Sequence, residues 1–277
     1  MPRIHPTAIV HKEAQLADDV EVGPHCVIES DVRIGPGTVL REGVVVRRHT
    51  TLGSGNFVDA YAVLGGEPQD LKFRRQTVSY VRIGDNNILR EHVTISRATG
   101  EEMATQVGSN TYWMGNSHAG HNATIEDGAI LVNNVSVGGH ATIGRRAILS
   151  ANMLVHQFCW IGEMVMTQGN AGSSTHVPPY CLFANINRVV GLNVVGLKRA
   201  KDITAEDRRQ IKEAFRLTYR AHMSPAKALV RMDACTDWGA AAGKFRDFIR
   251  RVLTAEKPYN RGLCPLRLLR GHHMDGL

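Results

Sequence analysis

The sequence predicts a short-period solenoid followed by a helical C-terminal region, and three observations support this architecture. Aliphatic residues recur at every sixth position from Ile4 to Leu64, a period that neither a helix nor an ordinary strand has. A second series with the same period runs from Ile83 to Ile161, broken at Glu101. Beyond the repeats, apolar residues take helical spacing. Internal repetition of this kind is the signature of a solenoid.

Each hexad contributes two inward side chains, because a small or branched residue such as Val20, Cys26 or Val32 stands two places before each aliphatic one. The hexads 22–27 and 34–39 resemble the hexapeptide repeats of left-handed parallel β-helix acyltransferases, in which three hexads make one triangular coil. The resemblance implies a mainly β fold. Residues that differ by eighteen in number would stack in columns, and successive coils would pair as parallel strands about 4.8 Å apart.

The repeats predict a left-handed β-helix domain over residues 1–190 and a helical domain over residues 191–277, with an extended tail from about residue 258. The tail has no counterpart in the family that the repeats resemble. With 277 residues and 43% hydrophobic content, the chain can bury a substantial core, so two structural parts are expected.

Two interruptions of the repeat are candidates for function. The two aliphatic series are nineteen residues apart, a slip of one residue, so the segment near residues 65–80 must leave the coil as a loop. A smaller excursion is expected near residues 100–106. Loops that project from a rigid scaffold often carry binding groups, and Asp70 and Lys72 are the polar residues of interest. A solvated turn is the alternative interpretation.

The excess of basic residues is C-terminal. From Lys198 onward there are 18 Lys or Arg against nine Asp or Glu, whereas the first 197 residues carry a net charge of −2. Thr204 with Asp207 has the pattern of a capping box, and Ser224 with Pro225 indicates the start of another helix. One helix face carries a basic stripe, Arg208, Lys212, Arg216 and Arg220.

Like charges four residues apart repel one another on a helix, and an acidic partner would relieve that repulsion. A merely solvated basic face is the alternative. Nucleic acid is not an expected partner, because no aromatic platform or binding motif accompanies the stripe.

The chain shows no signal peptide and no run of about 20 apolar residues, so we expect a cytoplasmic protein without a membrane span. Five cysteines form no CxxC pair and are odd in number, which indicates buried free thiols rather than disulfides or a zinc site.

Four histidines are predicted to converge at one edge of three adjacent coils. His118 and His121 flank one inward position, and eighteen residues beyond His121 lies Gly139, directly before His140. Eighteen residues before His156 lies the neighbouring glycine. Imidazole is the side chain suited to proton transfer near neutral pH, so the cluster predicts acid–base chemistry, with a metal site as the competing use.

Several separated motifs narrow the resemblance to the UDP-N-acetylglucosamine O-acyltransferases that begin lipid A synthesis. The family implies a homotrimer with active sites between subunits, and an acidic acyl carrier protein that delivers a 3-hydroxyacyl chain to the sugar 3-hydroxyl. It implies no cofactor beyond the phosphopantetheine thioester of that carrier, and no metal. The motifs are QDLK at 69–72, GNSHAGH at 115–121, VHQFC at 155–159, VPPY at 177–180 and GLNVVGLKR at 191–199.

The resemblance also implies roles for individual residues. His121 matches the general base that takes the proton of the sugar hydroxyl, and the N–H of Gly139 matches the oxyanion donor. Asn193 and Arg199 match the nucleotide and phosphate site, where a guanidinium can grip phosphate oxygens. Gly169 falls where the family measures acyl length. Further substrate contacts match Gln69, Asp70, Lys72, His118, His140, His156 and Gln157. The basic stripe would dock the acyl carrier protein.

Two departures from the family pattern keep alternatives open. Asn122 follows the catalytic histidine where many members have an acidic residue, and Ala200 replaces one phosphate-binding cation. A paralogue that acylates another nucleotide sugar, or a 3-amino sugar, is therefore an alternative. A γ-class carbonic anhydrase would space its histidine pair five apart, not three as in this chain. A non-catalytic scaffold would have no use for His121, Gly139, Asp70 and Lys72 together.

Overall fold

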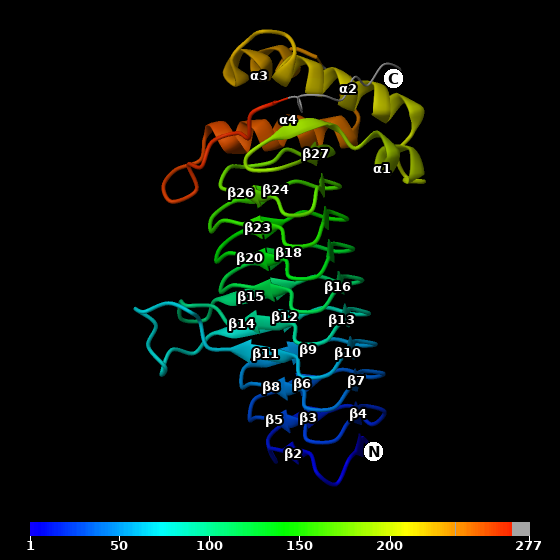
Figure 1. Ribbon diagram of the computed structural model, residues 1–277, viewed down its shortest axis with the longest axis vertical. Helices are drawn as coiled ribbons and strands as arrows, with labels where there is room; N and C mark the ends of the chain where they lie inside the picture. The colour runs from blue at the N-terminus through cyan, green and yellow to red at the C-terminus, as the bar shows by residue number, and fades with distance from the viewer. Residues whose placement is uncertain (236, 268–277) are drawn as a thin grey trace.

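The computed structural model describes residues 1–235 and 237–267. Over these residues the chain winds as a three-sided prism whose faces are sheets of short strands, and four helices cover one end (Figure 1). Within the described chain, every strand pairing is parallel except that of β27 with β28. The predicted solenoid is therefore confirmed as a parallel β-helix.

On each face of the prism, short strands from successive coils lie side by side along its length. Face A contains β1 (Arg3–Ile4), β4 (Glu21–Val22), β7 (Val39–Leu40), β10 (Phe57–Val58), β13 (Ile88–Leu89), β16 (Tyr112–Trp113), β19 (Ile130–Leu131), β22 (Ile148–Leu149), β25 (Met166–Thr167), β27 (Cys181–Phe183) and β28 (Val189–Leu192). Face B contains β2 (Ile9–Val10), β5 (Val27–Ile28), β8 (Val45–Val46), β11 (Val63–Gly66), β14 (Thr94–Ser96), β17 (His118–Ala119), β20 (Ser136–Val137), β23 (Leu154–Val155) and β26 (Gly172–Ser173). Face C contains β3 (Gln15–Leu16), β6 (Arg33–Ile34), β9 (Thr50–Leu52), β12 (Tyr80–Ile83), β15 (Ala104–Val107), β18 (Thr124–Ile125), β21 (Thr142–Ile143) and β24 (Trp160–Ile161).

Residues that pair between the regular successive coils differ by eighteen in number, except at two places. Ile83 pairs with Leu52, 31 residues before it, and Val107 pairs with Ile83, 24 residues before it. The first excursion thus inserts thirteen residues, 67–79, and the predicted slip of one residue was wrong. The second inserts six residues between Ser96 and Val107, and residues 104–106 belong to strand β15 rather than to the expected excursion. The longer insertion is the cyan loop that projects from the prism in Figure 1.

The two inward positions of each hexad form the core, as the period predicts. Val20, Cys26 and Val32 are completely buried, and the aliphatic residues two places after them are at most 3% exposed. The first coil is the exception, because no coil covers it from below, and Ile4 remains 42% exposed.

Four helices cover the other end of the prism. They are α1 (Val194–Arg199), α2 (Ala205–Tyr219), α3 (Pro225–Asp233) and α4 (Ala240–Leu253). The capping box of Thr204 and Asp207 is confirmed at the start of α2, and Ser224 caps α3 with Pro225 in its first turn. Helices α2, α3 and α4 bury a shared core that includes Phe215 and Phe245. None of the described helices is long and apolar enough to cross a membrane.

Charged groups join the helices to the prism. Glu163, 9% exposed, accepts hydrogen bonds from Nη2 of Arg146 at 3.1 Å and from Nζ of Lys244 in α4 at 2.6 Å. Arg146 also reaches Asp202, between α1 and α2, at 2.7 Å. Since Glu163 and Arg146 lie in the last coils, this network holds the helical region to the β-helix.

The segment after α4 returns to the β-helix. Leu263 forms a parallel bridge with His176, and Leu266 forms one with Val189. Residues 254–267 therefore pack against the last coil instead of extending away from it, and residues 268–277 of the predicted tail lie outside the described residues. The cysteines are free, and four of them are buried as expected, but Cys235 is exposed.

Candidate active site

The corner between faces B and C brings the predicted histidines together. The chain turns there at residues 120–122, 138–140 and 156–158 in three successive coils. Asn122 and His140 take the left-handed conformation, with φ of 61° and 59°, which asparagine and histidine tolerate better than most residues. The turns therefore stack the side chains of three coils in one column.

His121 lies against Gly139 of the next coil. A Cβ atom at Gly139 would lie 2.7 Å from Cε1 and 2.8 Å from Nε2 of His121, so only glycine leaves room for the ring. Nδ1 of His121 is 3.0 Å from Oδ1 of Asn122. Because an amide oxygen only accepts, Nδ1 carries a proton, and in the neutral ring Nε2 then keeps its lone pair. Among the described residues, nothing accepts a hydrogen bond from the N–H of Gly139.

A cavity of about 550 Å³ opens beside this corner. Six of the predicted site residues line it, namely Gln69, His118, His121, Gly139, His156 and Gln157. The remaining lining comes from Gly120, Ser136, Val137, Gly138, Leu154, Val155, Gly172, Ser173, Ser174 and Ile186. The cavity thus runs from the first excursion along face B toward the helical end.

His118 and His140 flank the catalytic candidate as neutral imidazoles. Nδ1 of His118 is 2.8 Å from Oγ1 of Thr94, and burial lowers the pKa of the His118 imidazole. His140 stacks on Phe158 at 4.7 Å between ring centroids and meets the ring of His121 edge-on at 5.2 Å. Burial lowers the pKa of His140 as well. Both rings are therefore suited to hydrogen bonding rather than to charge neutralisation.

The first excursion brings its polar residues back toward the corner. Oδ1 of Asp70 accepts the N–H of Lys72 at 2.8 Å, which closes a turn. The charge of Asp70 acts on His140, where it opposes the effect of burial on the pKa. The side chain of Lys72 is exposed, and no described group pairs with it. Both residues lie outside the cavity lining, and their substrate contacts remain predictions.

Three other predicted residues lie elsewhere. Asn193 caps α1, where its Oδ1 accepts the N–H of Gly196 at 3.0 Å and its Nδ2 donates to the carbonyl of Met164 at 3.0 Å. At 5% exposure, its polar atoms are engaged within the chain. Arg199 is exposed at the end of α1, and Gly169 is half-buried in a turn between β25 and β26.

Several cavity residues that were not predicted could have been found from the eighteen-residue spacing of stacked positions. Ser136 pairs with His118, and Leu154 pairs with Ser136, so both follow His118 at multiples of eighteen. Gly172 and Ser173 continue these columns, since they pair with Leu154 and Val155. Ile186 had no comparable signal, because the regular repeat ends before it.

Two of the four cations of the basic stripe already form hydrogen bonds within the chain, so fewer of them are available to a partner than their spacing suggested. Arg216 forms two hydrogen bonds with Glu213, and Arg208 donates to the carbonyl of Ile203 at 2.7 Å. Lys212 and Arg220 remain without a carboxylate partner in the described chain, although Arg220 lies over the ring of Phe215.

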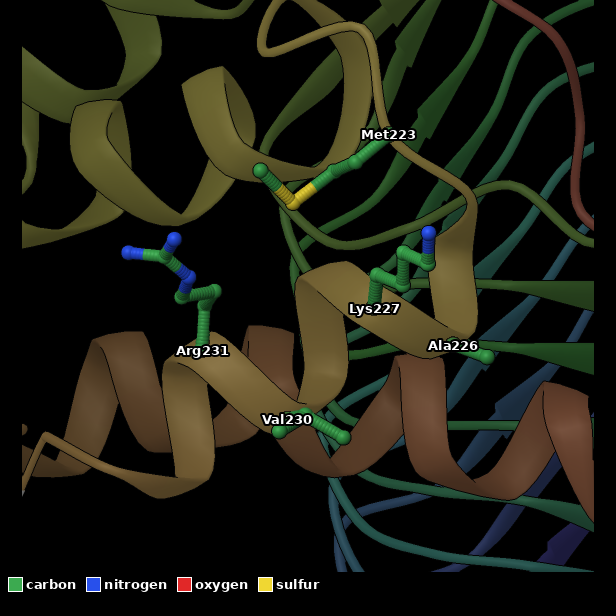
Figure 2. A pocket seen from close by; sticks show the side chains of 5 residues that line it. All are labelled: Met223, Ala226, Lys227, Val230 and Arg231. Carbon is green, nitrogen blue, oxygen red and sulfur yellow. The ribbon is translucent and has the colours of Figure 1, made fainter.

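A second cavity, of about 360 Å³, lies along α3. Figure 2 shows the two cationic side chains, Lys227 and Arg231, on the same helix as the apolar Val230, with Met223 nearby. Val230 is 68% exposed. This helix therefore presents an apolar patch with positive charge beside it.

A parallel β-helix of hexads, with a histidine packed on a glycine at one corner, defines a transferase of the hexapeptide-repeat class. Comparison with known families agrees, because the family described as "Bacterial transferase hexapeptide (six repeats)" matches residues 13–48. The family described as "Udp N-acetylglucosamine O-acyltransferase; Domain 2" matches residues 176–264. That match extends to residue 264, so the expectation that the tail has no counterpart was wrong for residues 258–264.

Individual relatives identify the family. The acyl-[acyl-carrier-protein]–UDP-N-acetylglucosamine O-acyltransferase of Stenotrophomonas maltophilia (strain K279a) is 38% identical over 263 residues, 94% of this chain and 98% of the relative. The crystal structure of the UDP-N-acetylglucosamine acyltransferase from Bacteroides fragilis 9343 has a TM-score of 0.84 at 36% identity, covering 89% of this chain and 96% of that one. The enzyme from Moraxella catarrhalis RH4 has a TM-score of 0.87 at 34% identity, covering 94% and 99%. The chain belongs to the acyl-[acyl-carrier-protein]–UDP-N-acetylglucosamine O-acyltransferase family, and its solenoid is a left-handed β-helix.

Proposed function

We propose that this protein transfers a 3-hydroxyacyl chain from acyl carrier protein to the 3-hydroxyl of UDP-N-acetylglucosamine, the first step of lipid A synthesis, in the cytoplasm. The main support for the proposal is the pair formed by His121 and Gly139 at the corner between faces B and C. Nε2 of His121 keeps its lone pair beside the unbonded N–H of Gly139, and both line one cavity. The relatives that match most of the chain are named for this reaction.

In the proposed reaction, Nε2 of His121 takes the proton of the sugar 3-hydroxyl while that oxygen attacks the thioester carbonyl. The N–H of Gly139 donates to the oxyanion of the tetrahedral intermediate. Collapse of the intermediate breaks the carbon–sulfur bond and forms the ester. The leaving thiolate takes the proton back from the His121 imidazolium, so the enzyme returns to its starting state.

The protonation state of Cys159, which directly follows the turn at residues 156–158, favours direct attack of the sugar hydroxyl on the thioester over a covalent acyl-enzyme. Burial raises the pKa of Cys159 to about 11, so this thiol stays protonated at neutral pH and is a poor nucleophile. The proposed reaction needs no covalent acyl-enzyme and no bound cofactor, because the phosphopantetheine thioester of the carrier supplies the activated acyl group.

The proposed assembly is a homotrimer with the sites between subunits. Arg199 is absent from the lining of the cavity in its own chain, although it is a predicted phosphate ligand. A neighbouring copy that packs along the prism would supply this cation to the cavity of the first. In this arrangement the nucleotide lies between two chains.

The acyl carrier protein, an acidic partner, is proposed to dock on the helical region. No described carboxylate is bound to four cations of this region, namely Lys212 on α2, Arg220 at the C-cap of α2, and Lys227 and Arg231 on α3. Lys212→Gln should raise KM for the acylated carrier several-fold and leave KM for an acyl-pantetheine thioester unchanged. Arg209→Gln is the matched control, because Glu206 already pairs with Arg209. Equal effects of the two variants would contradict docking at Lys212.

The test of the reaction is acyl transfer from a panel of 3-hydroxyacyl carrier proteins, with products weighed by mass spectrometry. We expect an ester of UDP-N-acetylglucosamine, and loss of turnover in His121→Ala with an unchanged melting temperature. His92→Ala is the control, since His92 stacks on Tyr61 away from the cavity. Transfer only to a 3-amino sugar would favour the paralogue suggested by Asn122 and Ala200. Transfer to neither acceptor would refute the proposal.

A further inference from the structure

The six-residue insertion between β14 and β15 supplies the partners of Asn122. Thr99, in this insertion, donates its backbone N–H to Oδ1 of Asn122 at 3.0 Å and its hydroxyl to the same oxygen at 2.9 Å. Nδ2 of Asn122 points to Sδ of Met103, 3.7 Å away in the same insertion. The amide beside the catalytic histidine is therefore held by one short segment that the regular repeat lacks.

These contacts determine which way the amide faces. A backbone N–H can only donate, so the atom of Asn122 that faces Thr99 must be the oxygen. The same oxygen lies 3.0 Å from Nδ1 of His121. Nδ1 must then carry the proton, which leaves the lone pair on Nε2, next to Gly139. A flipped amide would offer N–H groups to His121 and favour the tautomer whose Nε2 is protonated and cannot act as a base.

We propose that Thr99 is a positioning residue that fixes the Asn122 amide and, through it, the base-competent tautomer of His121. An asparagine needs such a residue because its two ends differ, whereas the two oxygens of a carboxylate accept equally in either orientation. The insertion thus lets a neutral side chain orient the base. The inference rests on the proposed function for its kinetic readout.

The test compares Thr99→Val, which keeps the backbone donor and loses the hydroxyl, with Thr99→Ser, which keeps both. We expect Thr99→Val to lower kcat about tenfold with KM changed by less than about twofold, the size of one lost hydrogen bond. Thr99→Ser should retain nearly all activity.

A double variant separates orientation from general structural support. In the Asn122→Asp background, Thr99→Val should have little further effect, because a carboxylate has no wrong orientation. Asn122→Asp alone should move the acid side of the kcat profile to higher pH, since the added negative charge stabilises the imidazolium. Equal losses from Thr99→Val in both backgrounds, or no loss in either, would overturn the proposal.

A spectroscopic measurement keeps this test independent of the proposed reaction. The ¹⁵N chemical shifts of the His121 ring, assigned by comparison with His121→Ala, report its tautomer without substrate. We expect protonated Nδ1 in the native protein and a larger share of protonated Nε2 in Thr99→Val, where the backbone N–H alone still favours the amide oxygen. Protonated Nε2 in the native protein would refute the role of Thr99. Absence of acyl transfer with the expected shifts would refute the proposed function alone.

Discussion

At the scale of single residues, the corner depends on the space beside Gly139. The ring of His121 occupies the volume that a Cβ atom would need, so the glycine both admits the ring and leaves its own N–H next to it. The proposed base and the proposed oxyanion donor are thus placed by one close contact between adjacent coils. A change of a single methyl group at this position tests the arrangement.

Gly139→Ala should lower kcat/KM about a hundredfold, because the new methyl group would displace the His121 ring by roughly 1 Å and misalign the base. The melting temperature should fall only slightly, since the corner is half open to solvent. Gly191→Ala is the matched control, because nothing lies within 4 Å of its Cβ position. Similar activities of both variants would show that the His121 contact is not needed. Steady-state kinetics of the two purified variants decides the matter.

At the scale of elements, the first excursion, residues 67–79, is anchored to the prism by Arg97. This side chain is only 2% exposed, donates from Nη1 to the carbonyl of Thr77 at 2.8 Å, and lies 4.9 Å from the ring centroid of Phe73. Its backbone N–H donates to the carbonyl of Gly66 at 2.8 Å. Arg97 therefore contacts one end of the segment that carries Gln69, Asp70 and Lys72 through its backbone, and the middle and the other end through its buried guanidinium.

Arg97→Met should loosen this excursion without unfolding the prism. Lys72, Arg74 and Arg75 are exposed, so trypsin should cut the excursion about tenfold faster, the effect of losing about 1.4 kcal/mol of local stability. Activity should fall in parallel. Arg82→Met is the control, because Arg82 is an exposed residue of β12 whose guanidinium lies over the ring of Tyr80. An unchanged cleavage rate in Arg97→Met would contradict this anchoring role.

The C-terminal segment is also tied to one buried residue. Nδ1 of His176 accepts the backbone N–H of Trp160 at 3.1 Å, and Nε2 donates to the carbonyl of Tyr259 at 2.7 Å. Both contacts require a neutral ring with its proton on Nε2. Burial lowers the pKa of His176, so the folded protein takes up this proton at lower pH than the unfolded chain does.

Acid should therefore destabilise the protein. Unfolded histidine titrates near a pKa of about 6.5, so the stabilisation is complete above that pH and is lost as pH falls toward the lower folded pKa. His118 and His140 act in the same direction. We expect the free energy of unfolding to fall between pH 7.5 and 5.5, and to fall less in His176→Phe, which keeps the ring stacked on Trp160. Parallel pH curves would exclude His176 as a source.

The hexad period sufficed to predict the inward positions, the columns and the meeting of four histidines, because all of them depend only on counting residues. Counting failed at the insertions. The first insertion of thirteen residues is one residue longer than two hexads, and the second, of six residues, is as long as one hexad. The sequence period therefore does not reveal the length of either insertion. Thr99 and Asn122 are 23 residues apart, across the second insertion, and no column relates them. The contact between Thr99 and Asn122, which is proposed to orient the base, could therefore not be predicted from the repeat spacing.

At the scale of the whole molecule, the cavity of one chain contains the proposed base but not every predicted substrate-binding residue. His121 lines it, whereas Arg199 lies at the end of α1 outside the lining. A homotrimer with sites between subunits predicts that these two residues act from different chains. Solution mass should then correspond to three copies of the 30.5 kDa chain.

Mixed trimers test this arrangement directly. His121→Ala and Arg199→Ala should each have almost no activity alone, because the first lacks the base and the second lacks a phosphate ligand. When both are co-expressed in equal amounts, about one site in four should pair an intact His121 from one chain with an intact Arg199 from its neighbour, given random assembly. Activity should recover to about a quarter of the native value. If each site were built within one chain, no mixture could contain an intact site, and the co-expressed protein would remain as inactive as its parents.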